Sequence, residues 1–258
     1  MSKPGHVSTV KLILTSAGIL ATAFLLCVVA SWLLKWRPFH KEVTHYTPSL
    51  ELQIKHQQLY QGLDALRTLL DRARIPWWPI AGTLLGMARH GALIPWDDDI
   101  DLAIWSRDLG RVKHILMREK WAHFSFGTHI TIFFQDVHID IIGCTLSPQG
   151  HVVYDNTYWQ WMFPREYFDH PEDVRIEKDV KFGSTTCPCP SEDVVCTFLD
   201  RAYPGWRTLA VIQQGHDFTR PWEMIKGLFT RTTMPLEGHA HLCQTTPTPT
   251  QTPKPSSS

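Results

Sequence analysis

The sequence has no excess of charge of either sign, because its 25 Lys and Arg balance its 25 Asp and Glu. Binding to nucleic acid through phosphates needs a clustered excess of basic side chains, so nothing here indicates a nucleic-acid partner. Cysteine is also scarce, and six in 258 residues are too few for a disulfide scaffold. What the chain does have is 43% hydrophobic residues, enough for a buried core, which excludes wholesale disorder.

Charge is completely missing from one long segment, Leu12 to Leu34. At about 1.5 Å per residue a helix of that length measures about 35 Å, so the segment predicts a transmembrane helix. A cleaved signal peptide is the alternative, with small residues at Val28-Val29-Ala30, but the apolar run continues to Leu34 and favours an uncleaved signal anchor. Residues 1–11 then form a cytoplasmic tail and residues 35–49 a stem.

The remaining chain predicts one α+β domain over residues 50–236, in which helical and strand patterns are mixed. Leucines at helical spacing predict an amphipathic helix from Leu52 to Leu70. Residues 237–258 are rich in Thr, Pro and Ser and predict a disordered tail. The other predicted elements are strands over 77–81, 100–105, 129–134 and 137–142, a turn at Gln135-Asp136, a helix over 83–90 closed by Gly91, and a helix capped by Ser191.

Four carboxylates crowd into the five residues from Asp97 to Asp101. In an extended chain Asp97, Asp99 and Asp101 point to one side, and the apolar residues between and after them point to the other. A solvated loop is the usual explanation of an acidic run, but core-type residues flank this one on both sides. Buried carboxylates repel one another unless a cation compensates them, so the pattern predicts a site for Mg²⁺ or Mn²⁺.

Gly82 and Thr83 lie where a strand gives way to a helix, which is a typical place for a phosphate to approach free backbone N–H groups. With the acids that follow, they predict a site that grips a diphosphate together with its metal and favours transfer at phosphorus. Arg89 can reach a donor phosphate, or it can simply complement the helix dipole. Asp140 shares a strand face with His138, and alternation alone favours a merely half-exposed polar position.

Cysteines and tryptophans give weaker indications. Cys187, Cys189 and Cys196 lie close in sequence, and Cys144 and Cys243 complete the set outside the predicted membrane span. They lack the paired spacing of a zinc site, so in an oxidising lumen we expect a disulfide among them. Five is an odd number, so one thiol should stay free or pair between chains. Trp159 and Trp161 can stack on a sugar or a base, but in a chain with 11 Trp, core packing is the favoured expectation.

The run from Gly82 through Leu102 closely resembles the signature of the LicD family of fukutin-like phosphotransferases. It joins Gly-Thr-Leu-Leu-Gly, Arg-His-Gly and Ile-Pro-Trp-Asp-Asp-Asp-Ile-Asp, and looser similarity continues to Trp206. The resemblance implies a nucleotidyltransferase-like mixed sheet flanked by helices. It also implies transfer of a phosphorylated alcohol, such as choline phosphate or ribitol phosphate, from a CDP-activated donor to the hydroxyl of a glycan or glycoprotein acceptor.

By the same resemblance, Asp99 and Asp101 hold Mg²⁺, Asp97 supports them, and Asp140 is the third carboxylate of the catalytic site. Gly82, Thr83 and Arg89 then contact the donor phosphates. With the anchor and the Thr/Pro-rich tail, this implies a single-pass type II membrane protein of the Golgi or ER with a lumenal catalytic domain.

Two other functions stay open. A glycosyltransferase with an Asp-x-Asp motif also binds a nucleotide diphosphate, but it does not need Gly-Thr at a helix start before the acids. A membrane-tethered protein that binds a glycan or an enzyme without catalysis would need no intact acidic motif, and this motif is intact.

Overall fold

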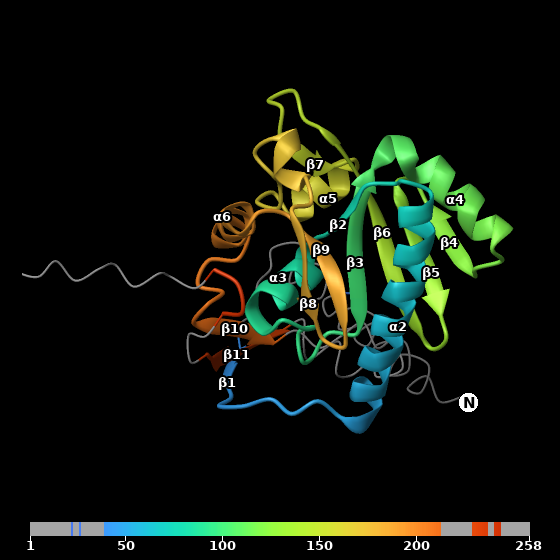
Figure 1. Cartoon of the computed structure of the whole chain (residues 1–258). Coiled ribbons are helices and arrows are strands. Elements are labelled where there is room, and N and C mark those ends of the chain that lie inside the picture. The colour runs from blue at the N-terminus through green and yellow to red at the C-terminus, as the bar shows by residue number, and fades with distance from the viewer. Residues whose placement is uncertain (1–21, 23–25, 27–38, 213–228, 237–239, 244–258) are drawn as a thin grey trace, which may run out of the picture. The chain divides into compact units, whose positions relative to one another are not determined.

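The structure is a computed structural model that describes residues 22, 26, 39–212, 229–236 and 240–243. The chain divides into two compact units, a larger one of Tyr46–Ala210 with Pro235–Ser258 and a smaller one of Met1–His45 with Val211–Met234. The larger unit combines helices with strands that pair mostly antiparallel, as Figure 1 shows in outline. The predicted α+β class is therefore confirmed.

The larger unit is built on a six-stranded mixed sheet. Its strands follow the order β2 (Trp77–Pro79), β3 (Asp99–Trp105), β6 (Val137–Leu146), β5 (His129–Phe134) and β4 (His123–Phe126), and β7 (Val152–Tyr154) also pairs with β6. β3 and β6 run parallel, whereas the other neighbouring strands are antiparallel. The parallel pair places residues that are about forty positions apart in sequence directly side by side.

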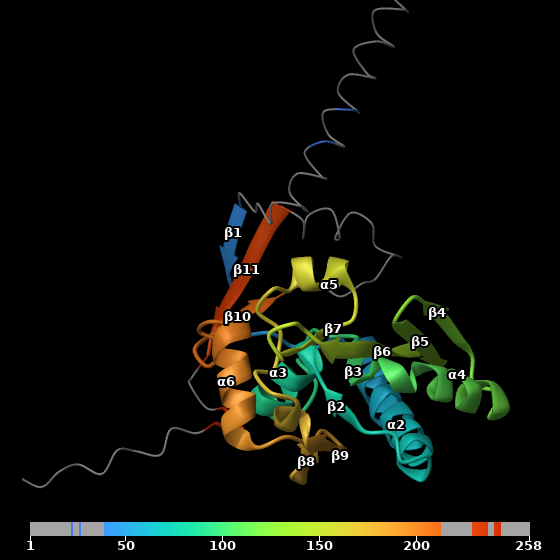
Figure 2. The ribbon, with the colours of Figure 1, turned by 90° about the horizontal axis from the view of Figure 1, so that it is seen from above.

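Helices lie on both sides of this sheet. They are α2 (Leu50–Arg72), α3 (Ala81–His90), α4 (Leu109–Arg118), α5 (Thr157–Met162) and α6 (Glu192–Ala202), with short 3₁₀ turns η1 (Ser106–Asp108) and η2 (Pro171–Val174). Figure 2 shows α2 on one side of the sheet and α5 on the other. The two faces of the sheet therefore meet different surroundings.

The face against α2 is the apolar core. The predicted leucine stripe is confirmed, since Leu59, Leu63 and Leu66 are buried. A Cβ built at Gly62 would lie 3.1 Å from Cδ1 of Ile139, so α2 packs closely against β6. Strand alternation, visible as alternating buried and half-buried residues at the start of β6, turns the polar side chains to the opposite face.

Turns and caps follow the sequence signals. Gln135-Asp136 joins β5 and β6 as a two-residue hairpin turn, and Gln135 adopts a φ of 52°. Gly91 ends α3 with a φ of 62°, and the Ser191 side chain accepts a hydrogen bond from the N–H of Val194 at the start of α6. These three predictions are confirmed.

The expected disulfide among the cysteines outside the predicted membrane span is present. Cys196 on α6 bonds to Cys243, whereas Cys187 and Cys189 are buried free thiols, as is Cys144. Cys187 and Cys189 lie on β9 (Thr185–Cys189), which forms a hairpin with β8 (Lys178–Phe182). Both side chains are fully buried. The part of the chain that the structure describes thus holds three thiols beside the disulfide, not one.

A second sheet of three strands joins β1 (Phe39–Glu42), β11 (Thr230–Pro235) and β10 (Leu209–Ile212). β1 and β11 are parallel. Within the described residues, no helix has the length and apolar character needed to cross a bilayer. The predicted anchor over residues 12–34 lies outside that part apart from Thr22 and Leu26, and of the predicted tail only residues 240–243 fall within it.

Candidate active site

The sheet face turned away from α2 carries the predicted acids. In the parallel register Asp99 lies opposite His138, and Asp101 lies opposite Asp140. Thr131 of β5 is the next residue across, opposite Asp140. We call this surface, made by these five residues, the acid face. It brings together Asp101 and Asp140, which the sequence separates by a helix and two strands.

The loop before β3 is fixed against the start of α3. A Cβ built at Gly82 would lie only 2.8 Å from Oδ2 of Asp97, so any larger residue would displace that carboxylate. The Asp101 N–H donates to Thr83 Oγ1 at 2.8 Å, and His56 Nε2 donates to the backbone O of Asp97 at 2.7 Å. The predicted glycine motif and the acidic motif therefore meet in one place.

The first residue of α3 has an uncommon backbone conformation. Ala81 adopts a φ of 51°, in the left-handed region that residues with a Cβ seldom occupy, and no side chain caps the helix start. Backbone outliers of this kind persist where the surrounding structure enforces them, and they cluster at ligand sites. The outlier directly precedes Gly82.

Burial and mutual repulsion disfavour the ionised form of two of the acids. Burial raises the pKa of Asp97 well above that of an ordinary aspartate, and the charges of Asp99 and Asp98 raise it further. Burial likewise raises the pKa of Asp101, followed by the charges of Asp99 and Asp140. A site that holds these carboxylates together gains stability from any cation placed among them.

Two histidines give Asp140 a different environment. Burial alone would raise the pKa of Asp140, but its contacts with His129 and Thr131 and the charges of His129 and His138 outweigh burial and lower it. His129 Nε2 lies 3.0 Å from Asp140 Oδ1, and His138 Nε2 lies 3.8 Å from Asp99 Oδ2. Asp140 is therefore ionised under conditions that favour the neutral form of Asp101.

The donor set fits a divalent cation. Ligand atoms of Asp99, His138 and Asp140 lie within 4.8 Å of one another, and so do carboxylate oxygens of Asp97, Asp98 and Asp99. Carboxylate oxygens are the ligands that Mg²⁺ and Mn²⁺ prefer. Burial, followed by repulsion from neighbouring carboxylates, raises the pKa of Asp97 and Asp101, and a cation held there would offset both effects.

Arg89 is buried near the acids but is not a free surface cation. It is 6% exposed, its Nε donates to His90 Nε2 at 2.9 Å, and its Cζ lies 5.8 Å from the centre of the Trp96 ring. Burial lowers the pKa of Arg89 to about 10, while the charge of Asp97 opposes this shift. At neutral pH it stays a guanidinium on the same side as Asp97.

The segment around the disulfide holds the end of α3 in place. The N–H of Leu242 donates to the Ala88 carbonyl at 2.8 Å, and the N–H of Cys243 donates to Glu192 Oε1 at 2.7 Å. Because Cys196 of α6 is bonded to Cys243, the segment Leu242–Cys243 links α6 to α3. This segment supports the helix that carries Arg89.

Sequence reasoning did not identify a buried glutamate behind the acid face. Glu166 is 7% exposed and accepts hydrogen bonds from the hydroxyls of Tyr154, at 2.5 Å, and Tyr203, at 2.7 Å. The charge of Glu166 contributes to the raised pKa of Asp101. Glu166 lies in an irregular loop, where no periodicity could have indicated its burial.

The predicted core packing of Trp159 and Trp161 is wrong. No residue of α5 is buried, and the Trp161 side chain is 56% exposed. The Trp159 ring packs edge to face on His129 with centroids 6.2 Å apart. Since His129 contacts Asp140, α5 lies beside the acid face, on the side that Figure 2 shows opposite α2.

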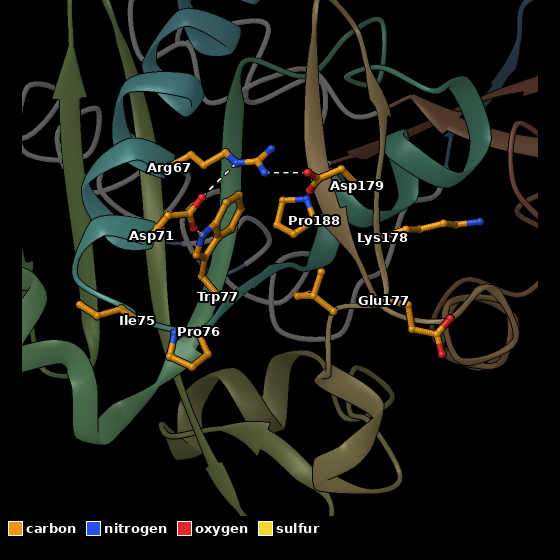
Figure 3. A pocket seen from close by; sticks show the side chains of 10 residues that line it. Arg67, Asp71, Ile75, Pro76, Trp77, Glu177, Lys178, Asp179 and Pro188 are labelled. Carbon is orange, nitrogen blue, oxygen red and sulfur yellow. Dashed lines mark hydrogen bonds and ion pairs between the residues drawn. The ribbon is translucent and has the colours of Figure 1, made fainter.

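Away from the acid face, a cleft of about 360 Å³ lies between the end of α2 and the β8–β9 hairpin. Figure 3 shows the side chains of Arg67, Asp71 and Asp179 facing one another. Arg67 contacts Asp179 at 2.7 Å and Asp71 at 3.2 Å, and Asp71 also accepts from Trp77 Nε1 at 3.1 Å. These groups satisfy each other, so this cleft has the character of a structural contact.

Comparisons with known proteins agree with the geometry. Residues 74–192 match the family model described as LicD/FKTN/FKRP, nucleotidyltransferase domain. An uncharacterized protein of Rickettsia prowazekii is 29% identical over 178 residues, which cover 65% of this chain and 62% of that protein. The human ribitol 5-phosphate transferase FKRP is 45% identical over 47 residues, 18% of this chain and 10% of that protein. The lipopolysaccharide cholinephosphotransferase LicD of Haemophilus influenzae is 34% identical over 80 residues, 30% of each chain.

The chain spans less than two thirds of the length of the curated relatives that it matches. The matched segment nevertheless contains the start of α3, the acidic loop, β3 and β6, so it includes every residue of the acid face. The resemblance predicted from the sequence is confirmed, since residues 74–192 match the LicD/FKTN/FKRP nucleotidyltransferase-domain model.

Proposed function

We propose that this chain transfers a phosphorylated alcohol, such as phosphocholine or ribitol phosphate, from a CDP-activated donor to a hydroxyl of a glycan. The observation that carries the proposal is the register that sets Asp101 of β3 opposite Asp140 of β6, beside the glycine at the start of α3. Family relatives named as a ribitol 5-phosphate transferase and a cholinephosphotransferase support this reaction class.

The donor diphosphate binds at the start of α3. Gly82 has no side chain to hinder its approach, and the first N–H groups of a helix attract an anion. Arg89 adds a buried positive charge on the Asp97 side. Thr83 keeps its hydroxyl oxygen on the Asp101 N–H, so its contribution is to hold the helix start against β3.

Asp99, Asp101 and Asp140 hold Mg²⁺ or Mn²⁺, and Asp97 supports them. The ion supplies neutralisation of the diphosphate charge, which is the main requirement of transfer at phosphorus. Support comes from ligand atoms of Asp99, His138 and Asp140 that lie within 4.8 Å of one another, and from the register that sets Asp101 opposite Asp140.

Asp140 acts on the acceptor. Its low pKa keeps it ionised, so a carboxylate oxygen can take the proton that the acceptor hydroxyl loses. The hydroxyl oxygen forms a new P–O bond to the phosphorus that carries the alcohol, and the P–O bond to CMP breaks. CMP leaves with the electron pair of that bond. His129 holds Asp140 in place through their 3.0 Å contact.

The proposed location is the lumen of the ER or Golgi, reached by an uncleaved anchor over residues 12–34. The Cys196–Cys243 disulfide supports an oxidising compartment. Protease added to sealed microsomes is expected to leave the domain intact until detergent is added. Digestion without detergent would contradict the lumenal location.

The reaction is tested with the full chain, purified in detergent and supplied with Mg²⁺. We expect CMP release from at least one of CDP-ribitol, CDP-choline and CDP-glycerol, and we expect chelation of the metal to stop it. Asp99→Asn should stop it as well.

The matched control is Asp136→Asn, which removes an exposed carboxylate in the β5–β6 turn and should keep wild-type activity. CMP release that persists at the wild-type rate in Asp99→Asn would contradict the proposal. Release of a nucleoside diphosphate from a nucleotide sugar would instead assign the site to a glycosyltransferase.

A further inference from the structure

The acid face continues beyond its carboxylates into a strip of exposed aromatic rings. Phe133 of β5 and Phe124 and Phe126 of β4 are 50%, 61% and 75% exposed, respectively. In the strand register, Phe133 lies opposite His138, and Phe124 lies opposite Thr131. Paired residues of antiparallel strands share a face, so all three rings lie on the acid face. We call these three residues the phenylalanine strip.

Three large apolar side chains exposed together on one face are unusual, because folding normally buries such residues. Contiguous exposed apolar surface marks a place where something binds. On the other side of β5, Ile130 and Ile132 are fully buried. The exposure of Phe133 therefore belongs to this face of β5.

The strip starts at the reacting groups. Phe124, Thr131 and Asp140 follow one another on adjacent strands β4, β5 and β6. Neighbouring strands lie about 4.8 Å apart, so Phe124 is about 10 Å from Asp140, roughly the length of two sugar rings. A molecule that lies on the strip can present one end to Asp140.

We propose that the phenylalanine strip binds the sugar rings of the acceptor glycan, next to the hydroxyl that is modified. The proposal rests on the proposed function, in which the donor lies at Gly82 and α3. In transfer at phosphorus the attacking oxygen and the leaving group lie roughly in line on opposite sides of the phosphorus. CMP leaves on the α3 side, so the acceptor approaches from the side of β5 and β4.

The chemistry of the strip suits a sugar. One face of a pyranose ring is a patch of C–H groups, which packs on an aromatic ring as other apolar surfaces do. Thr131, His129 and His138 lie between the strip and the acids and offer hydrogen-bonding groups to the ring hydroxyls. Trp159, packed on His129, borders this side of the acid face. Nucleic acid is a poor occupant, because its phosphates would approach a carboxylate cluster.

Binding is measured directly on an array of neutral oligosaccharides, with the full chain in detergent, CDP and Mg²⁺ present. We expect the wild-type protein to bind at least one glycan of two or more rings. The double variant Phe124→Ala/Phe126→Ala should lose at least 10-fold in affinity for that glycan. Both rings are more than half exposed, so the thermal midpoint of the variant should stay near that of the wild type.

Ile54→Ala is the matched control, since Ile54 is 52% exposed and lies on α2, at the opposite face of the sheet. It should bind the same glycan as the wild type does. Where transfer to that glycan is measurable, the double variant should raise the acceptor KM at least 10-fold and change kcat less than 3-fold.

Three outcomes would overturn the inference: no array glycan bound by the wild type, equal binding by the double variant, or a dimer that the double variant dissociates while glycan binding is kept. The last would assign the strip to a second copy of the chain. CMP release from the CDP donors into water, measured on the wild type without acceptor, tests the proposed function separately. Glycan binding that depends on the strip, without CMP release from any donor, would keep the strip and reject the transferase.

Discussion

The cleft in Figure 3 and the acid face handle charge in opposite ways. In the cleft, the Arg67 guanidinium contacts two carboxylates, and the pKa of Arg67 is raised, first by Asp179. On the acid face, carboxylates are set beside carboxylates, and burial together with this repulsion raises the pKa of Asp97 and Asp101. The first cluster is neutralised by the fold itself, and the second is where we propose that a cation binds.

This difference separates a structural cluster from a candidate site. Placing like charges together lowers the free energy of unfolding. A protein retains such an arrangement where it serves binding or catalysis. Oppositely charged pairs at a surface contribute little in either direction. Substitutions that remove a charge from the acid face should therefore strongly reduce activity and leave stability unchanged or increased. Substitutions in the cleft should leave activity unchanged and lower stability only slightly.

The largest effect is expected for Asp101→Asn. The change keeps the shape of the side chain but removes a charge proposed to hold the metal, so CMP release should fall by at least about 1000-fold. Without Mg²⁺, the thermal midpoint should equal or exceed that of the wild type, because the repulsion with Asp99 and Asp140 is relieved. Activity assays and thermal melts check the two halves.

The sign of its pH dependence follows from the raised pKa. Above the folded-state pKa of Asp101, the wild type holds an ionised, repelled carboxylate, and the variant gains its full stability advantage. As pH falls through that pKa toward the ordinary value of 3.8, the wild-type group becomes protonated and the advantage disappears. A stability gain that instead grew toward low pH would contradict the raised pKa.

Asp140→Asn should have the next largest effect. Loss of a general base reduces transfer by about 100-fold or more, whereas donor binding should stay near normal because Asp99 and Asp101 still hold the metal and Gly82 and α3 are unchanged. Transfer to acceptor and binding of a CDP donor are measured separately.

Asp136→Asn on the same hairpin is the control for Asp140→Asn. A transfer rate for Asp140→Asn within a few-fold of the wild type would remove Asp140 from the site. The base would then have to be sought among other groups near the acid face, of which Glu166 is the most deeply buried.

Local signals in the sequence predicted the parts of the fold that depend on local physics. The leucine stripe of α2, the turn at Gln135-Asp136 and the glycine end of α3 arise from neighbouring residues, and the structure has all three. The Cys196–Cys243 bond joins residues 47 positions apart and depends on how the chain folds back. The sequence therefore predicted that a disulfide forms, but not which cysteines pair.

The site was predictable to the same extent. Asp97 to Asp101 and Gly82 are local motifs, and alternation correctly put Asp140 and His138 on one face of β6. The register that sets Asp140 opposite Asp101 is a long-range property, and only the family resemblance indicated it beforehand. Glu166 and the exposure of Trp161 had no local signal, because a loop and a one-turn helix carry no usable periodicity.

A smaller effect is expected from substitution of His90, which accepts a hydrogen bond from the guanidinium of Arg89. Burial, followed by the charge of Arg89, lowers the pKa of His90 to about 4, so it is neutral in the folded state. The unfolded chain binds the proton more readily between the ordinary value of 6.5 and about 4. Stability should therefore decrease as pH falls through this window, by about 3 kcal/mol at most over the whole window and by about 2 kcal/mol at most down to pH 5.

His90→Gln should flatten that part of the stability profile, since Gln can still accept from Arg89 Nε and does not titrate. Urea unfolding of both proteins at pH 7, 6 and 5 measures the difference. Parallel profiles for the two proteins would show that another group causes the acid sensitivity.

The smallest effect is expected for a substitution in the cleft around Arg67. Asp179→Asn removes the charge that Arg67 contacts at 2.7 Å, but both side chains are partly exposed, at 26% and 43%. Water screens such a pair, so the loss should be about 0.5 kcal/mol, with CMP release unchanged and a smaller difference still in high salt. Arg67 keeps its contact with Asp71, which further limits the damage. Loss of activity in Asp179→Asn, with stability intact, would give the cleft a functional role and break the distinction between the two clusters.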